Sequence, residues 1–246
     1  MKPAGGIVIV APLVLLLLSP SSPPDAIQTT WAAAARKRVV FGHSTNDRRL
    51  RAVRLGSRSP ATTVLVVGCI HGNECAGKAV IRALKRRNVP ADLKIWTVKD
   101  LNPDGSGART RQNARGVDLN RNFGRKWKKI GKPWDTYHSG KKPFSEPETR
   151  AARRFILRRR PDVTIWYHQR MALVARSNRR DVQSRYAKLV GLPLVRLKPL
   201  PGTATRWQNH RLKRGTAFVV ELKAGALSRK AAKRHARAVI QVGRMM

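Results

Sequence analysis

The chain has 246 residues, enough for one sizeable folded domain with a well-filled core, and its sequence contains no internal repeat. Its 52 lysine and arginine residues against 13 aspartate and glutamate residues give a net charge of +39, which favours polyanionic partners. The basic residues are spread through the chain and no zinc-finger, RRM or KH pattern is present, so nucleic-acid binding is unfavoured.

The N-terminus has the order of a secretory signal. Lys2 is followed by an apolar run over residues 7–18 and then by a Ser- and Pro-rich break. The apolar run is too short to span a bilayer comfortably. We therefore predict an export signal and spacer over residues 1–36, a folded domain over residues 37–246, and no transmembrane span in the mature chain. Such a protein is secreted or associated with the cell wall, where the nearest polyanions are anionic wall polymers and lipid headgroups.

The first part of the predicted domain consists of strands and a helix. Residues 38–41 and 50–55 predict two short strands joined by a turn. Residues 64–70 are almost continuously apolar and rich in β-branched side chains, which is typical of a strand buried on both faces of a parallel sheet. An amphipathic helix follows from residue 75 onward.

The turn between this strand and helix carries His71 and Glu74. Ligands bind beyond the carboxyl ends of strands in open α/β sheets, and an imidazole with a carboxylate suits zinc. The pattern HxxE is weak evidence alone, because a turn histidine beside a solvated glutamate would give it too. Cys69 and Cys75 flank the turn; they could form a disulfide or remain two buried thiols.

After a further predicted strand at residues 93–98, residues 109–123 are dense in arginine and asparagine. The composition favours neither a helix nor a strand, and we interpret the segment as an irregular loop that presents hydrogen-bond donors. Guanidinium groups bind carboxylates through two parallel hydrogen bonds. Residues 117–119 would tether the loop to the core, although a solvated basic loop is the alternative.

A second histidine stands at the end of a predicted strand. Ser145 and Glu148 predict a capping box for a helix that ends near Arg159. Residues 162–167 then predict an apolar strand that ends at His168. If this strand lies parallel to and beside the strand before the HxxE turn, His168 joins the first two candidate ligands around one point.

The last candidate site residue is Glu221. Residues 217–220 predict another apolar strand, and Glu221 follows it directly. The chain has only four glutamates, and Glu74 and Glu221 both stand at strand ends, which indicates a use; a buried Glu221 paired with an arginine is the alternative. Residues 228–242 predict a final helix, with His235 on its solvated face.

Taken together, these features resemble the zinc carboxypeptidase family. The matching elements are HGNE at residues 71–74, NPDG at 102–105, RQNARGVDLNRNF at 111–123, SEPET at 145–149, the strand-terminal His168 and VEL at 220–222. The resemblance implies a single α/β domain with a mixed, mostly parallel sheet flanked by helices. The motif forms look most like the bacterial murein peptide amidases, which cut the γ-D-glutamyl to diaminopimelate bond of peptidoglycan stem peptides.

By this resemblance, His71, Glu74 and His168 would bind one zinc ion per chain and leave a fourth position for water. Glu221 would act as the general base toward this zinc-activated water and then as the general acid toward the leaving amine. The implied activity is that of an exported zinc peptidase or amidase acting on peptidoglycan stem peptides.

Three residues of the donor-rich loop would contact the substrate. Arg111 would stabilise the oxyanion of the tetrahedral intermediate, and Asn120 and Arg121 would bind a substrate carboxylate. In the digestive enzymes a mobile tyrosine precedes the catalytic glutamate. No tyrosine occupies that segment here, and Trp207 or His210 would line it instead.

Two other functions remain open from the sequence. One is a conventional metallocarboxypeptidase that acts on proteins. The other is a non-catalytic basic protein that binds cell-wall polyanions on the same fold. A complete set of ligands with Glu221 intact disfavours the second.

Overall fold

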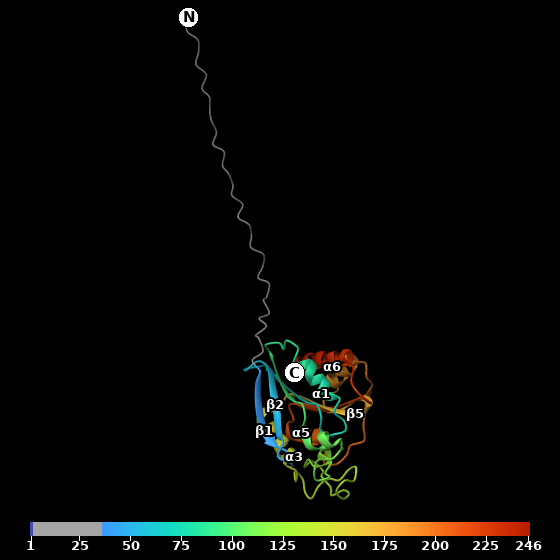
Figure 1. Ribbon diagram of the computed structural model, residues 1–246. Coiled ribbons are helices and arrows are strands. Elements are labelled where there is room, and N and C mark those ends of the chain that lie inside the picture. Colours follow the sequence, from blue (N-terminus) through green and yellow to red (C-terminus); the bar gives the residue numbers. More distant parts are fainter. Residues whose placement is uncertain (2–35) are drawn as a thin grey trace. The chain divides into compact units, whose positions relative to one another are not determined.

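The computed structural model describes Met1 and residues 36–246 (Figure 1). The predicted export signal and spacer, residues 1–36, fall almost wholly outside the described residues. Among the helices of the described part, none combines the length and the apolar character needed to cross a membrane.

The described residues form one sheet and its flanking helices. The strands are β1 (Lys37–His43), β2 (Arg49–Gly56), β3 (Thr62–Val67), β4 (Leu93–Val98), β5 (Val163–Ala175), β6 (Leu194–Val195) and β7 (Thr216–Lys223). The helices are α1 (Gly77–Leu84), α2 (Pro103–Ala108), α3 (Pro147–Arg159), α4 (Arg180–Val190), α5 (Ala204–Arg211), α6 (Arg229–Gly243) and a short 3-10 helix, η1 (Leu119–Arg121).

The sheet is mixed, with a parallel centre. Its order is β1-β2-β4-β3-β5-β6, and β7 pairs with β5. The pairs of β3 with β4, β3 with β5 and β5 with β7 are parallel, whereas β1 and β2 form an antiparallel hairpin that joins the sheet through β4. This confirms the predicted single α/β domain with a mixed, mostly parallel sheet flanked by helices.

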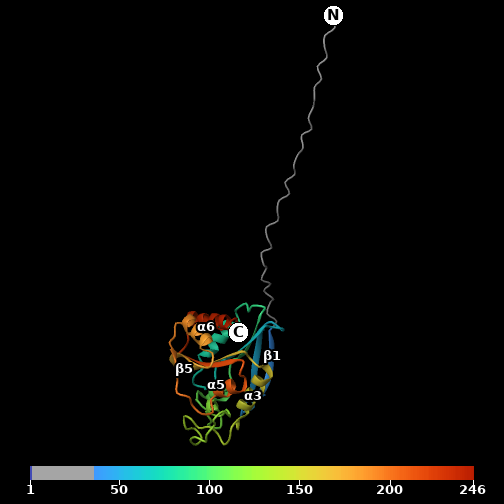
Figure 2. The same ribbon diagram turned by 180° about the vertical axis from the view of Figure 1, so that it is seen from behind.

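Helices cover both faces of the sheet. Val64 and Val66 of β3 pack into a core shared with α1, α4 and α6, whereas Leu65 and Val67 pack into a second core shared with α3 and α5. β3 is therefore buried on both faces, as its apolar sequence predicted. Figure 1 shows α1 and α6 on one side of the strands and α3 and α5 on the other, and Figure 2 shows the same separation from behind.

β5 is longer than the sequence predicted, and its extra length shapes the site. The strand does not end at His168 but continues to Ala175. Up to Arg170, β5 pairs with β7 in parallel. Beyond Arg170 the order of the partners is reversed, with Leu173 opposite Glu221 and Val174 opposite Val220. The second part of β5 therefore runs back along β7, and the end of the strand lies near the beginning of β7.

The predicted capping box is wrong. Helix α3 has Glu146 at its N-cap and no side-chain hydrogen bond there, and Ser145 donates to the Glu146 carboxylate instead. The fully buried Glu148 accepts hydrogen bonds from the Thr45 backbone N–H at 2.8 Å and from the Asn113 amide at 3.2 Å. Because Asn113 belongs to the donor-rich loop, Glu148 stabilises that loop rather than the helix end.

The predicted exposure of His235 is also wrong. Its side chain is buried between α6 and α4, where Nδ1 lies 2.8 Å from the Tyr186 hydroxyl, which in turn lies 2.6 Å from the Tyr167 hydroxyl. Burial lowers the pKa of His235 to about 4. The ring is therefore neutral near pH 7, which is why it is accommodated in the core.

Candidate functional site

The first two candidate ligands lie in the loop between β3 and α1. His71 and Glu74 fall in this loop, as predicted, and both side chains are buried. A disulfide joins Cys69 and Cys75, whose Cα atoms are 4.7 Å apart, so the structure has the disulfide and not the free thiols. The covalent link closes the loop on either side of both ligands.

The third candidate ligand, His168, reaches the same point from β5. β5 pairs in parallel with β3, with Trp166 opposite Val67. The segments that follow these two residues therefore continue in the same direction. The possible ligand atoms of His71, Glu74 and His168 all lie within 4.8 Å of one another. The neighbouring parallel strands that the sequence predicted thus bring the three side chains together.

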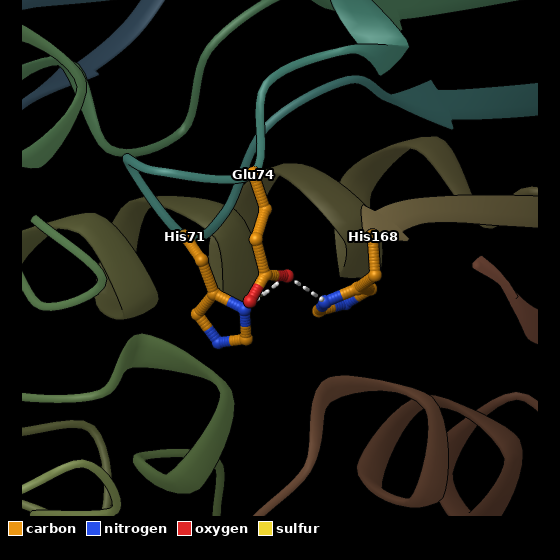
Figure 3. A group of neighbouring side chains, drawn as sticks. All are labelled: His71, Glu74 and His168. Atoms are coloured by element: carbon orange, nitrogen blue, oxygen red, sulfur yellow. Dashed lines mark hydrogen bonds and ion pairs between the residues drawn. The ribbon is translucent and has the colours of Figure 1, made fainter. Parts of the chain in front are cut away.

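Figure 3 shows the Glu74 carboxylate between the two imidazole rings. Its Oε2 lies 2.9 Å from His71 Nδ1 and 3.3 Å from His168 Nδ1. Burial alone would raise the pKa of Glu74, but the hydrogen bonds from His168 and His71 hold it well below its usual range. Burial lowers the pKa of His168 to about 4, so its ring is neutral near pH 7, the form that binds metal.

Asp118 holds His71 from the other side of the ring. Its Oδ1 lies 2.8 Å from His71 Nε2, and the carboxylate is fully buried. A carboxylate bound to one ring nitrogen fixes the orientation of the imidazole and leaves the other nitrogen for a metal. The sequence analysis treated Asp118 only as part of a tether, although the scarcity of acids in this chain was a usable signal.

The donor set fits a zinc ion. Two imidazole nitrogens and one carboxylate oxygen are donors that zinc takes in catalytic sites, where three protein ligands leave one coordination position open. The buried Oε2 of Glu221, in the same cleft, has no hydrogen-bond partner among the described residues. His71, Glu74 and His168 would therefore hold one ion, and Glu221 lines the same cleft.

Arg111 bridges the two carboxylates that surround His71. Its Nη1 donates to Glu74 Oε1 at 2.7 Å, and its Nε and Nη2 donate to Asp118 Oδ2 at 3.1 and 3.0 Å. The backbone carbonyl of Thr136 also accepts from Nε, at 3.2 Å. The guanidinium is thus fixed beside the ligand cluster, where the sequence predicted an oxyanion-stabilising group.

Asn120 and Arg121 lie in η1 and line the cleft, and both are largely buried. Asn120 Oδ1 accepts from the Ala204 backbone N–H at 2.9 Å, which links the loop to the start of α5. Arg121 Nη1 donates to the Asn120 carbonyl at 2.8 Å, and its guanidinium lies over the Tyr137 ring, 4.8 Å from the centroid. These contacts fix the two side chains that were predicted to bind a carboxylate.

Glu221 lies on β7, directly opposite His168 in the sheet register. Burial, with the negative charge of Glu74 as a second cause, raises the pKa of Glu221 to about 6. It is not one of the three residues whose ligand atoms converge. A carboxylate with a pKa near neutrality can accept a proton and release it again, as a general base and acid must.

All seven predicted site residues line one open cleft of about 470 Å³. Tyr137, from the loop over residues 124–142, lies in it too and is half exposed. The predicted contribution of Trp207 or His210 is wrong, because Trp207 is buried in the core under α5 and neither residue lines the cleft. From α5, Arg206 and Asn209 line it instead, three residues apart on the helix.

Comparison with known proteins points to one family. Residues 27–184 match the zinc carboxypeptidase family. Murein peptide amidase A of Escherichia coli strain K12 is 32% identical over 142 residues, which are 53% of this chain and 59% of that protein. Murein peptide amidase A of Vibrio campbellii is 31% identical over 161 residues, which are 60% of this chain and 64% of that protein. The matched part thus spans about six tenths of these relatives.

Solved structures agree with the fold. The crystal structure of murein-tripeptide amidase from Escherichia coli O157 has a TM-score of 0.68 and 26% identity, and covers 84% of this chain and 91% of that chain. Carboxypeptidase A from Helicoverpa armigera has a TM-score of 0.73 at 17% identity, with coverage of 85% and 68%, which supports the fold alone.

The family match includes His71, Glu74, Arg111, Asn120, Arg121 and His168, whereas Glu221 lies beyond its end and is placed at the site by the pairing of β7 with β5. Sequence, fold and cleft therefore agree, and the prediction of a hydrolase of the metallopeptidase type holds at the level of the family. The chain belongs to the zinc carboxypeptidase family.

Proposed function

We propose that this protein is an exported, zinc-dependent amidase that hydrolyses the bond between γ-D-glutamate and diaminopimelate in peptidoglycan stem peptides. The observation that carries the proposal is the cleft itself, in which a buried His-Glu-His cluster lies beside a carboxylate of raised pKa. The names of the amidase relatives support the choice of substrate.

The ligand residues would hold one zinc ion through His71 Nδ1, His168 Nδ1 and the Glu74 carboxylate. When bound, zinc supplies a Lewis acid that polarises a carbonyl and lowers the pKa of water. Asp118 keeps the His71 ring in the orientation that presents Nδ1 to the cluster.

Glu221 moves the proton. In its ionised form it takes a proton from the attacking water, and it then delivers that proton to the nitrogen of the leaving amine as the amide bond breaks. Its raised pKa matches both tasks, because the carboxylate predominates above about pH 6 and the acid form remains accessible. Glu221 lines the same cleft as the ligand cluster, which places its carboxyl group beside the space that the water would occupy.

The arginines and the asparagine of the donor-rich loop bind charge on the substrate. Arg111 donates to the oxygen that becomes negative as the carbonyl is attacked, a contribution of about 3–4 kcal/mol for one such donor. Asn120 and Arg121 bind the free carboxylate of the leaving residue and thereby fix the peptide in register.

The location and the wall partner follow from charge. The predicted export signal and the net charge of +39 favour an enzyme that works at the cell wall and is retained there by anionic polymers. Long-range electrostatic attraction would then keep the enzyme close to its substrate.

The test is to incubate the purified protein with defined muropeptides, with and without a chelator, and to identify the products by mass spectrometry. The proposal expects release of diaminopimelate-containing peptides from γ-D-glutamate, abolished by chelation and restored by zinc. Trimming of C-terminal residues from ordinary peptides, with γ-D-glutamyl bonds left intact, would instead support a conventional carboxypeptidase. Absence of both cleavages in zinc-loaded protein would support a non-catalytic wall-binding protein.

A further inference from the structure

The cleft carries more positive charge than the proposed chemistry uses. Among the described residues that line it, the carboxylates are Glu74 and Glu221, and Glu74 is already paired with Arg111. The cationic residues of the lining beyond Arg111 are Arg121, Arg176, Lys198 and Arg206. Arg176, Lys198 and Arg206 have no assigned role in the mechanism.

The cleft extends along β7, away from the ligand cluster. Ala217, Val219 and Glu221 alternate along this strand and so point to one face, and all three line the cleft. Ala217 precedes Glu221 by four residues, which separates them by about 13 Å along the strand. The floor between the two ends is apolar.

Arg176 lies at the Ala217 end of the cleft. Ser177, the next residue, donates from its hydroxyl to the Ala217 carbonyl at 2.9 Å. This position follows from the return of β5 along β7, which carries the end of β5 back to the start of β7. Arg176 is exposed and forms no ion pair within the described part of the chain.

Arg206 reaches the same end from α5. It lies three residues before Asn209, so the two share a helix face. Asn209 is fixed at Ala217 by two hydrogen bonds, accepting from the backbone N–H at 2.7 Å and donating to the carbonyl at 2.9 Å. Lys198 follows β6, which pairs with the end of β5, so it adds a third cation from a neighbouring segment.

The proposed carboxylate-binding residues lie next to the start of α5. Asn120 and Arg121 would bind the backbone carboxylate of the leaving residue, and Asn120 is hydrogen-bonded to Ala204, the first residue of α5. If a residue is held there, the cleft lined by Val219 and Arg206 lies open to its side chain.

We propose that Arg176 and Arg206, assisted by Lys198, form a second carboxylate-binding subsite that selects a leaving residue whose aliphatic side chain ends in a carboxylate. The inference rests on the proposed function and deepens it. Diaminopimelate has a three-carbon stem that ends in a carbon bearing both a carboxylate and an ammonium group, whereas lysine would bring an ammonium group with no carboxylate to offset it among the cations of this subsite.

The experiment compares four γ-D-glutamyl peptides that differ only in the leaving residue: diaminopimelate, 2-aminopimelate, norleucine and lysine. Aminopimelate keeps the terminal carboxylate without the second amine, and norleucine keeps only the apolar stem. Binding is measured by calorimetry on zinc-loaded Glu221→Gln protein, and kcat/KM is measured on the zinc-loaded parent chain. The binding arm does not depend on turnover.

The subsite predicts tighter binding of the two carboxylate-ended peptides than of the norleucine peptide, and weakest binding of the lysine peptide. Adding Arg176→Gln and Arg206→Gln to the Glu221→Gln protein should weaken the carboxylate-ended peptides about tenfold and leave the norleucine peptide unchanged. Arg237→Gln is the matched control; it removes one exposed charge on α6, which packs on the opposite face of the sheet, and should leave the ranking intact.

Equal binding of all four peptides, or an unchanged ranking in the Arg176 and Arg206 double substitution, would overturn the subsite. If binding ranks as expected but the parent chain cleaves none of the four peptides, the subsite stands and the proposed amidase activity fails. If the parent chain cleaves all four peptides with equal kcat/KM and the Glu221→Gln protein binds them equally, the amidase activity stands and the subsite fails.

Discussion

At the scale of single residues, Asp118 is the group on which the ligand cluster depends most. It binds His71 Nε2 through one oxygen and Arg111 through the other, while fully buried. We predict that Asp118→Asn lowers zinc affinity about 10–100-fold, since the ring of His71 loses its charged partner. Competition with a chromogenic chelator measures this. Asp181→Asn, at an exposed carboxylate on α4, is the control and should keep the parent affinity; an equal affinity in both variants would remove Asp118 from this role.

We predict that Glu221 determines the acid limit of activity. Because burial and the charge of Glu74 raise its pKa to about 6, the carboxyl is protonated below that pH and cannot accept a proton from water. The logarithm of kcat/KM on a small soluble muropeptide should therefore fall with decreasing pH below about pH 6 and level off above it. Stopped assays across the acid and neutral range, with zinc content checked at each pH, measure the profile. A profile without a bend near this pH in zinc-loaded protein would contradict the assignment.

At the scale of elements, the loop between β3 and α1 presents two ligands and is closed by the disulfide between Cys69 and Cys75. Without that link the unfolded chain gains freedom, which for so short a loop is worth about 2 kcal/mol of stability. We predict that the double substitution Cys69→Ala and Cys75→Ala lowers the unfolding free energy of the zinc-free protein by about this amount and also weakens zinc binding. Denaturant unfolding and zinc titration measure the two effects. Parent-like values in both measurements would show that the disulfide supports neither the fold nor the ligands.

The sequence predicts elements best where one local pattern decides them. β3 and β4 are rich in apolar and β-branched residues, and the ends of α3 and α4 are marked by Pro161 and Gly191. Local sequence patterns do not predict an element whose course depends on a contact with a distant part of the chain. Nothing in the residues after His168 shows that β5 will turn over the end of β7, because the reversal depends on pairing with a strand some fifty residues later.

The same reason explains the errors at particular side chains. Ser145 and Glu148 have the spacing of a capping box, but Glu148 is hydrogen-bonded to Asn113 and Thr45, which come from other parts of the chain. His235 was expected on a solvated face of a basic helix, yet it is hydrogen-bonded to Tyr186 of α4. The three candidate ligands could be predicted from the sequence because His71 and Glu74 lie just beyond one apolar run and His168 directly follows another.

At the scale of the whole molecule, the excess of basic residues determines long-range behaviour. A net charge of +39 attracts a polyanionic wall over roughly the Debye length, which is about 10 Å at 0.1 M salt. We predict that binding of the protein to isolated cell walls weakens sharply as ionic strength rises, while cleavage of a small soluble muropeptide changes far less. Sedimentation with walls and solution assays at matched salt concentrations measure the two. Salt-insensitive wall binding would exclude this electrostatic retention.

The central claim is that this chain holds zinc through His71, Glu74 and His168 and uses Glu221 to move the proton. The most direct test measures zinc content and muropeptide turnover side by side in the parent chain, in Glu221→Gln and in His168→Ala. The account predicts about one zinc per chain in the parent and in Glu221→Gln, with most turnover lost in the latter, and loss of both metal and turnover in His168→Ala. Full zinc occupancy in His168→Ala, or turnover retained in Glu221→Gln, would contradict it.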